Sequence, residues 1–391
     1  MQVWIEYRDA FDFPHRMNVS TSGSMAFPLV ETSYVDFETG IPVPGWVPPA
    51  QENFGAAVQR FLDLCVKYED MILPGFEGFP DKDSIPEDLV MPFRDLVEKY
   101  DLADAVPQLW DATAMGLGNT MDVPSMFVMQ GSGLLMARSF LGQAHGAIPA
   151  SGRLYDLYDA VADFLGDDVL YSSTIVSAWR HDDGVHLTVK GADGKITCIK
   201  AKRLVVAAQP TPETMKPLKL DKQEQEIFDK LGFSTVYAGI VKHPSLHANR
   251  AYHNRSPKPG STDYLVWPEP SQVGLIDWIG DTDDIFTFTA VGTSDDNVEN
   301  MKRLVRESVD NMVEAGTLED DGELEFLAVA DHGKMHVRIS EEDLRAGFVQ
   351  KQLALQGHRS TWYTGAAFSA QFTTVLWEYN KVLLPEVIKG I

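Results

Sequence analysis

Five polar side chains stand out as candidates for acting on a substrate carbonyl group. Each of them donates or accepts a hydrogen bond or a proton: Gln130, Tyr237, His332, His336 and Tyr363. No GxSxG, HExxH, Walker loop or CxxC pattern accompanies them. The residues therefore favour hydrogen-bond activation of a substrate over nucleophilic or metal chemistry.

The spacing of His332 and His336 is i, i+4, which on a helix would place two metal ligands on one face. Gly333 lies between them and a strand is predicted over about 335–339, so we expect no helical metal pair. The only cysteines are Cys65 and Cys198, which excludes a disulfide framework and a thiolate cluster of the usual type. We expect no metal, and a reducing compartment, the cytoplasm.

Apolar and aromatic side chains recur over 105–136, 264–290 and 361–372. The candidates for substrate contact are Trp110, Met126, Phe127, Met129, Trp267, Trp278, Phe286, Phe288, Trp362, Phe368 and Phe372. Each one alone is more simply explained by core packing, and the methionines by gap-filling. As a group, in a chain with eight tryptophans, they predict a large apolar cavity.

Composition limits the classes of partner. The chain has 33 Lys and Arg against 57 Asp and Glu, a net charge of −24, which excludes a broad nucleic-acid or anionic-membrane surface. The hydrophobic share of 44% is ordinary for a globular chain with a sizeable core. No run of 18 apolar residues and no apolar leader occurs, so neither a membrane span nor a signal peptide is predicted.

Hydrophobic periodicity predicts the elements that position these residues. Helices are expected over about 51–69, 93–100 and 154–165, the last one ending at Gly166. A meander follows, with strands at 169–179, 185–189 and 196–199, separated by Asp- and Gly-rich turns. The apolar run at 203–209 is typical of a buried strand in a parallel sheet.

The second half alternates strands and helices. Strands over 233–241 and 274–291 are expected to form an antiparallel sheet, and 298–313 is an amphipathic helix. Asp221 and Ser340 each precede an acidic residue by three positions, which predicts a capped helix start at both places. The helix that starts at Ser340 is expected to continue to Gly357.

Two glycine pairs look like the beginning of a dinucleotide fingerprint. Gly116 and Gly118, and likewise Gly131 and Gly133, are followed by methionine where a third Gly or Ala is required. Neither pair follows a clear strand, so we interpret both as loops.

Six blocks, taken in order and spacing, carry a resemblance to one family. They are Tyr34–Gly40, Pro86–Phe93, Leu154–Tyr158, Ala201–Pro210, Gly347–Gly357 and Thr361–Phe368, the last followed by Leu376–Tyr379. The sequence resembles the fungal FAD-dependent oxidoreductases similar to β-cyclopiazonate dehydrogenase, within the flavin-containing amine oxidase superfamily. The likeness extends from about residue 30 to the end of the chain.

This resemblance implies a mixed α/β (α+β) fold of amine-oxidase type. A truncated flavin-type sheet with the meander would stand beside a substrate domain of antiparallel sheet and helices. The first is expected from residues 1–50, 140–212 and 340–391, and the second from 51–139 and 213–339. Proteins of this family open with a strand, a GxGxxG turn and a helix that hold the FAD pyrophosphate. These 391 residues contain no such unit.

Two interpretations of that difference remain. The sequence begins inside a longer gene product, or the fold has been repurposed. We expect the second, because a doubly wound domain without its first unit would expose apolar sheet. Tight FAD binding is then not expected, since two phosphate charges would lack their site.

The expected function is therefore that of a cofactor-independent cyclase or isomerase, a pericyclase such as a Diels–Alderase. It would preorganise a hydrophobic terpenoid or polyketide intermediate of fungal secondary metabolism in an apolar pocket. The first alternative is an FAD-dependent oxidoreductase, for which FAD would be the cofactor. The second is a non-catalytic carrier of an apolar metabolite. The expected partner is a hydrophobic small molecule, and no oligomeric state is predicted.

Overall fold

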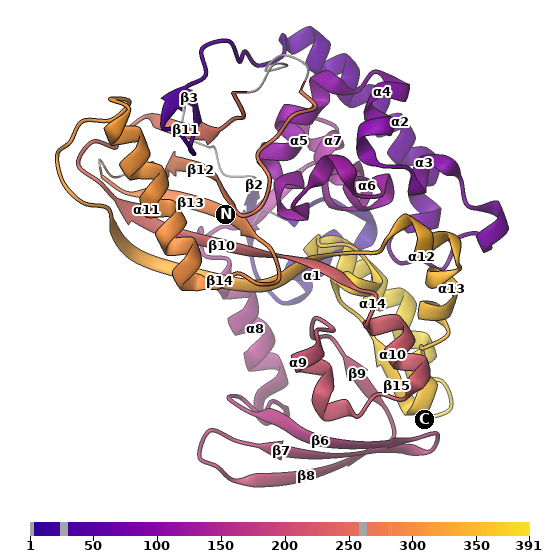
Figure 1. The fold of residues 1–391 in the computed structure, drawn as a ribbon. Helices are drawn as coiled ribbons and strands as arrows, with labels where there is room; N and C mark the ends of the chain where they lie inside the picture. Colours follow the sequence, from indigo (N-terminus) through magenta and orange to yellow (C-terminus); the bar gives the residue numbers. More distant parts are fainter. Residues whose placement is uncertain (1–3, 24–29, 258–263, 281, 283) are drawn as a thin grey trace.

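The computed structural model describes residues 4–23, 30–257, 264–280, 282 and 284–391. Within these ranges a seven-stranded sheet, a group of helices and a three-stranded meander occupy three parts of the molecule (Figure 1). This mixture of separate sheets and helices confirms the predicted α/β (α+β) class. None of the described helices is both long and apolar enough to cross a membrane.

The seven-stranded sheet is antiparallel except at one pair. Its order is β14-β10-β13-β12-β11-β3-β4, and β11 pairs with β3 in parallel. Helix α11 (Val298–Glu314) packs on one face, as its apolar stripe predicts. The strands are β3 (Glu31–Asp36), β4 (Ile41–Pro42), β10 (Gly232–Lys242), β11 (Arg250–Asn254), β12 (Gln272–Trp278), β13 (Phe286–Gly292) and β14 (Glu325–Arg338).

A group of helices lies beside this sheet (Figure 1). The group consists of α2 (Gln51–Ile72), α3 (Glu87–Val90), α4 (Phe93–Tyr100), α5 (Val106–Ala112), α6 (Ser125–Ser132) and α7 (Leu134–Phe140). The predicted helices at 51–69 and 93–100 are confirmed. Gly131, expected in a loop, instead lies in the last turn of α6, where only Gly133 interrupts the path into α7.

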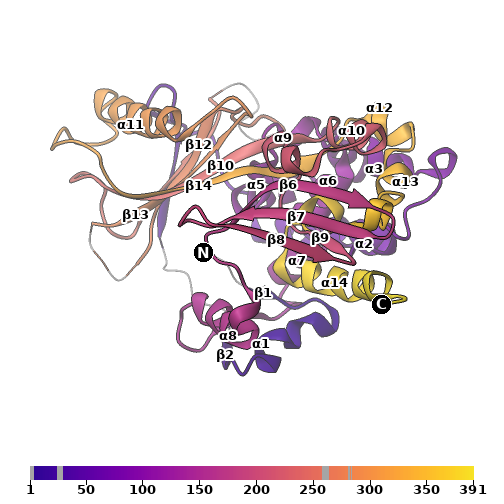
Figure 2. The ribbon, with the colours of Figure 1, turned by 90° about the horizontal axis from the view of Figure 1, so that it is seen from below.

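The meander closes one end of the molecule, in front of β9 and α10, and α14 runs alongside it (Figure 2). Its strands are β6 (Thr174–His181), β7 (Gly184–Lys190) and β8 (Ile196–Ala201). The first strand begins at Thr174 rather than at residue 169, because Ser172 takes a left-handed conformation with φ of 50°. After the meander, β9 (Leu204–Val206) pairs in parallel with β15 (Thr361–Tyr363).

Short helices connect these parts. The predicted starts at Asp221 and Ser340 are confirmed, and both side chains accept a hydrogen bond from the backbone three residues on. The helix expected to run from Ser340 to Gly357 is divided in two, because Gly347 has a φ of +81° and ends the first. The remaining helices are α1 (Phe13–Arg16), α8 (Tyr155–Leu165), α9 (Pro212–Met215), α10 (Lys222–Phe228), α12 (Glu341–Arg345), α13 (Phe348–Leu353) and α14 (Thr373–Ile388).

One continuous apolar cluster joins the helical group to the meander, α10 and α14. A second cluster lies between the seven-stranded sheet and α11. A small sheet of β1 (Trp4–Ile5), β5 (Gly146–Pro149) and β2 (Thr21–Gly23) fastens the N-terminal segment. Thr374 at the start of α14 donates its hydroxyl hydrogen to the carbonyl of Ile5, 2.8 Å away.

A buried ion pair holds the meander to α10 and β15. Arg180 on β6 donates to both carboxylate oxygens of Glu224, at 2.6 and 2.9 Å, and neither side chain is exposed to solvent. The hydroxyl of Tyr363 on β15 donates to the same carboxylate at 2.8 Å, and Arg359 contacts it at 3.1 Å. Arg180 also donates to the Leu218 carbonyl. Each charge is thereby surrounded by partners that offset its desolvation.

Removing one partner of this pair tests how much the pair contributes to the stability of the fold. We expect Arg180→Met to lower the free energy of unfolding by about 3–5 kcal/mol, because Glu224 is left as a buried charge with too few donors. Arg303→Met is the matched control, since Arg303 pairs with Glu307 on the exposed face of α11 and is worth about 0.5 kcal/mol. Urea unfolding followed by circular dichroism measures both. Equal midpoints for the two variants would contradict the assignment.

Candidate functional site

The carboxyl ends of β9 and β15 lie side by side and form one candidate site. The Thr364 amide donates to the Val206 carbonyl at 2.9 Å, which brings the two strand ends together. Gly365 follows with a φ of +97°, and a Cβ there would lie 3.1 Å from the Ala207 carbonyl oxygen. Ala207 and Ala208 are exposed beside it. Open parallel sheets bind ligands at this edge.

Two glutamine side chains that follow β9 and β15 in the chain carry unpaired polar atoms. Gln209 Nε2 and Gln371 Oε1 are enclosed and have no hydrogen-bond partner among the described residues. Helix α14 begins two residues after Gln371, and its N-cap Phe372 provides no side-chain cap. The start of α14 lies against β1, where the Thr374 hydroxyl donates to the Ile5 carbonyl, and Asn380, further along the helix, accepts from the Thr364 hydroxyl. We call the turn at Gly365, together with Gln209 and Gln371, the strand-end site.

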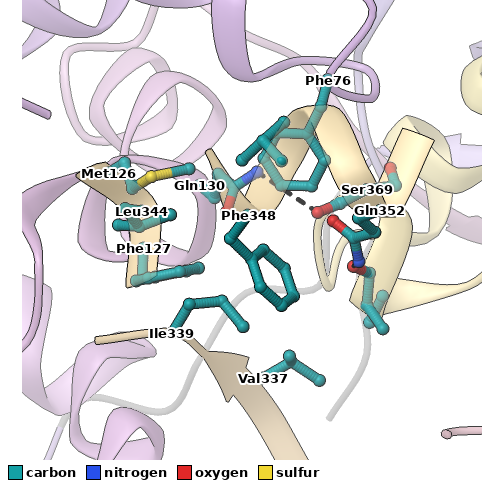
Figure 3. A pocket seen from close by; sticks show the side chains of 13 residues that line it. Phe76, Met126, Phe127, Gln130, Val337, Ile339, Leu344, Phe348, Gln352 and Ser369 are labelled. Atoms are coloured by element: carbon teal, nitrogen blue, oxygen red, sulfur yellow. Dashed lines mark hydrogen bonds between the residues drawn. The ribbon is translucent and has the colours of Figure 1, made fainter. Parts of the chain in front are cut away.

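A small apolar pocket of about 20 Å³, room for about one water molecule, includes Ala366, the residue after Gly365. Figure 3 shows the side chains that line it. We call it the Gln130 pocket. It is lined by Phe76, Met126, Phe127, Gln130, Val337, Ile339, Leu344, Phe348, Val349, Gln352, Ala366, Ala367 and Ser369. Its walls come from α6, the end of β14, the helices α12 and α13, and the turn after β15.

Three of the predicted site residues line this pocket, namely Gln130, Met126 and Phe127. They lie on consecutive turns of α6, so that helical spacing brings them to one face. Met129 is buried in the core on the same helix. The prediction did not include the opposite wall at 337–352. Its apolar residues carry no signal beyond ordinary amphipathic patterning.

The aromatic pair Trp110 and Trp267 lies elsewhere, between α5 and the seven-stranded sheet. The rings stack with centroids 4.7 Å apart, and they enclose Arg255 with its guanidinium carbon 5.6 and 5.0 Å from the two ring centres. Tyr34 and Trp46 complete the enclosure at 5.1 and 4.5 Å. Arg255 is 1% exposed, so this group is a filled aromatic cage rather than an open cavity.

Charged residues accompany this cage, and sequence reasoning missed them. Asp111 Oδ2 accepts from Arg255 at 2.6 Å and lies 3.1 Å from His253 Nδ1. The other ring nitrogen of His253 lies 3.1 Å from Asp277. Burial by itself would lower the pKa of His253, but Asp111 and Asp277 outweigh it and raise this pKa to about 9. The available signal was His253 near the end of an apolar strand, with Arg255 two residues later.

The remaining aromatic candidates are distributed over the core. Phe286, Phe288 and Tyr237 lie in the cluster beneath α11, and the Tyr237 hydroxyl donates to the Asp296 carbonyl at 3.0 Å. Trp278 is half-buried at the end of β12, and its indole nitrogen donates to the carbonyl of Thr282. The structure therefore does not bring these four side chains to the Gln130 pocket.

The two histidines occupy different environments on β14. His332 is exposed. The ring of His336 packs against Gly116, where a Cβ would lie only 2.2 Å from its Nε2. Burial, together with the Arg338 charge, lowers the pKa of His336 to about 4, so this ring is neutral at pH 7. No three His, Cys, Asp or Glu side chains in the described ranges are arranged to hold a metal ion.

The candidates near the C-terminus surround the strand-end site. Tyr363 stacks on Phe368 with centroids 5.4 Å apart, and its hydroxyl is held by Glu224. Burial, followed by the Glu224 charge, raises the pKa of Tyr363. Trp362 lies beneath the Arg203 guanidinium at 4.9 Å, and Phe372 precedes α14. The Tyr363 hydroxyl already donates its hydrogen to the Glu224 carboxylate.

Comparison with solved structures defines the class of fold. A fatty acid isomerase from P. acnes has a TM-score of 0.69 at 20% identity, covering 99% of this chain and 86% of that one. Putrescine oxidase has a TM-score of 0.61 at 12% identity, covering 99% and 87%. The fold is therefore that of the amine-oxidase-like flavoproteins. No protein-family profile matches the sequence.

Comparison with curated proteins defines the family. β-Cyclopiazonate dehydrogenase of Aspergillus flavus is 30% identical over 363 residues, which cover 90% of this chain and 74% of that protein. The FAD-dependent oxidoreductase pigF of Monascus ruber is 28% identical over 371 residues, covering 92% and 74%. This chain belongs to the family of fungal FAD-dependent oxidoreductases that includes β-cyclopiazonate dehydrogenase.

Two expectations from the sequence are therefore wrong. The relatives are named FAD-dependent oxidoreductases and the similar structures are flavoproteins, which points to FAD rather than to no cofactor. For the same reason the cofactor-independent cyclase or Diels–Alderase is not supported, and the oxidoreductase alternative fits better. The expectation rested on the pyrophosphate turn alone, whereas the strand-end site bears on the flavin end of the cofactor.

The residues of the strand-end site fit a flavin. The unpaired Gln209 donor and Gln371 acceptor match the mixed donors and acceptors of an isoalloxazine ring and ribityl chain. The absence of a side chain at Gly365 lets a ligand approach the backbone closely.

The contacts of His253 with Asp111 and Asp277 predict that the stability of the fold depends on pH. The pKa of His253 in the folded state, about 9, lies above the unfolded value of about 6.5. The stabilisation from these contacts is therefore complete below pH 6.5 and is lost as the pH rises through about 9. The free energy of unfolding should fall by about 3 kcal/mol over this interval. His253→Gln should remove most of this dependence in urea unfolding at pH 6.5 and 9.5. His247→Gln, on the surface, should keep it, and a pH dependence unchanged in His253→Gln would refute the assignment.

Proposed function

We propose that this chain is an FAD-dependent oxidoreductase that dehydrogenates a hydrophobic natural-product intermediate. The observation that carries the proposal is the pair of parallel strand ends at β9 and β15, where Gly365 leaves the backbone open to a ligand. The enclosed, unpaired Gln209 nitrogen supplies a hydrogen-bonding group after β9. The names and identities of the relatives support the same activity.

Bound FAD would supply the redox chemistry, accepting two electrons and a proton as a hydride from a substrate C–H bond. Gln209, Gln371 and the backbone around Gly365 are the residues that would hold its flavin end.

The chain's own contribution is positioning and exclusion of water. Phe76, Phe127 and Phe348 are buried and line the small Gln130 pocket with apolar surface, so they keep water away from the turn at Ala366. The buried Glu224 network fixes β15 from behind, so the turn after Tyr363 keeps its geometry. No ionisable side chain lines the pocket, so it holds no general base of its own.

Titration with FAD tests the proposal. We expect the purified chain to quench FAD fluorescence saturably, and Gly365→Ala to weaken this binding about tenfold, equivalent to about 1.4 kcal/mol. The new methyl group would occupy the approach to the strand end, 3.1 Å from the Ala207 carbonyl.

Gly194→Ala is the matched control for this titration. Gly194 also has a positive φ, +79°, but it lies in the β7–β8 turn with open space around it. The control carries the same kind of backbone strain and should bind FAD like the unaltered chain. Absence of saturable FAD binding, or equal binding by Gly365→Ala, would contradict the proposed site.

A further inference from the structure

Arg338, the last residue of β14, is a partly buried cation without an anionic partner. Its Nη1 donates to the Ser234 hydroxyl at 3.2 Å and to the His336 carbonyl at 3.4 Å, and its Nη2 donates to the Phe233 carbonyl at 3.2 Å. All three acceptors are uncharged. In the part of the chain that the structure describes, no Asp or Glu forms an ion pair with Arg338.

The two fully buried arginines of the described chain are neutralised, in contrast to Arg338. Arg180 lies 2.6 Å from Glu224, and Arg255 lies 2.6 Å from Asp111. Burial lowers the pKa of Arg338, and no acidic group opposes this effect. A partly desolvated cation costs free energy unless an anion joins it, and a chain with a net charge of −24 has many carboxylates that could have done so. The cation therefore points to an anionic ligand.

Arg338 and its neighbour His336 both keep hydrogen-bond donors for such a ligand. Arg338 Nε has no acceptor among the described residues, and it is not enclosed by them. Nε and Nη2 form one edge of the guanidinium group, and such an edge binds both oxygens of a carboxylate. The ring nitrogens of His336 also have no partner within the described ranges, and one of them carries a hydrogen in the neutral ring.

Two glycines make room for these side chains. The His336 ring packs on Gly116, where a Cβ would lie 2.2 Å from its Nε2. At Gly118, which has a φ of +79°, a Cβ would lie 3.7 Å from Arg338 Nη2. Ser234 joins the two elements, because its hydroxyl donates to the Gly116 carbonyl and accepts from Arg338. We call these five residues the Arg338 site, and the spacing of the two glycines serves this site rather than a dinucleotide.

The Arg338 site lies close to the strand-end site. Val337, which stands between His336 and Arg338 in the strand, lines the small pocket that includes Ala366. Ala366 directly follows the glycine of the strand-end turn. A ligand held at Arg338 is therefore near the place where a flavin would be held.

We propose that the Arg338 site binds the carboxylate group of an otherwise apolar substrate. Nε and Nη2 of Arg338 would hold the two carboxylate oxygens, and the neutral His336 ring would donate a further hydrogen bond. That the ligand is the substrate rests on the proposed function, whereas the carboxylate follows from the unpaired cation itself. An uncharged amide of the same shape would leave Arg338 without a counter-charge.

Equilibrium dialysis at pH 7 with two small matched probes tests this inference. The probes are hexanoate, which is charged, and hexanamide, which is neutral and has nearly the same shape. We expect hexanoate to bind saturably and about tenfold more tightly than hexanamide, the effect of hydrogen bonds to a charged group. The net charge of −24 repels anions from the surface in general, so such a preference needs a specific site. Equal binding of the probes, tighter binding of hexanamide, or no saturable binding of hexanoate would overturn the proposal.

Variants locate the preference. Arg338→Gln should weaken hexanoate binding about tenfold and leave hexanamide binding unchanged, because it removes the charge. Arg338→Lys keeps the charge without the planar fork and should weaken hexanoate binding about threefold, so it decides where Arg338→Gln fails to fold. Arg303→Gln is the control, since Arg303 pairs with Glu307 on the exposed face of α11. Full hexanoate affinity in a folded Arg338 variant, or an equal loss in the control, would refute the assignment.

The outcomes separate this proposal from the proposed function. Dialysis needs no FAD, so a preference for hexanoate in a chain that fails to bind FAD would refute the oxidoreductase and leave the carboxylate site standing. Saturable FAD binding without a preference for hexanoate would do the opposite. Arg338→Gln should bind FAD like the unaltered chain. Loss of FAD binding in this variant would assign the cation to the phosphates of the cofactor and overturn the substrate assignment.

Discussion

The buried pair of Arg180 and Glu224 is the constraint on which the joining of the meander, α10 and β15 depends. Burial alone would raise the pKa of Glu224, but the hydrogen bonds from Arg180 outweigh it and keep the carboxylate charged. This one carboxylate gathers groups from the meander, from α10 and from β15. The strand-end site begins one residue after Tyr363, so the carboxylate that holds the Tyr363 hydroxyl also constrains the position of that turn.

Local elements were predictable because their causes are local. The cap at Asp221 needs only Glu224 three residues later, and the amphipathic stripe of α11 follows from its own apolar spacing. The central role of Glu224 was not predictable, since its partners lie 44 and 135 residues away in the chain. A sequence shows Glu224 as a capping residue and gives no sign that its carboxylate is fully buried.

The site was predictable only in part for the same reason. Gln130, Met126 and Phe127, like the turn near Ala366, were chosen by resemblance, and the helix α6 that carries the first three was not predicted. Trp110 and Trp267 were expected to face a substrate, but their space is filled by Arg255, a cation 145 residues after Trp110 whose position only the sheet determines. The wrong expectation about FAD arose because one phosphate-binding motif was weighed more heavily than the strand ends.

The parallel pairing of β3 with β11 has a consequence for how the chain reaches its fold. Glu31 pairs with Arg250, and the side-chain oxygen of Asn254 accepts from the Phe37 amide across 217 positions of sequence. During synthesis the early strand therefore has no parallel neighbour until residue 254 has emerged, whereas the helices over 51–140 complete their mutual contacts much sooner. The seven-stranded sheet must form around helices already in place, and its β3–β4 edge is among the last parts of the molecule to close.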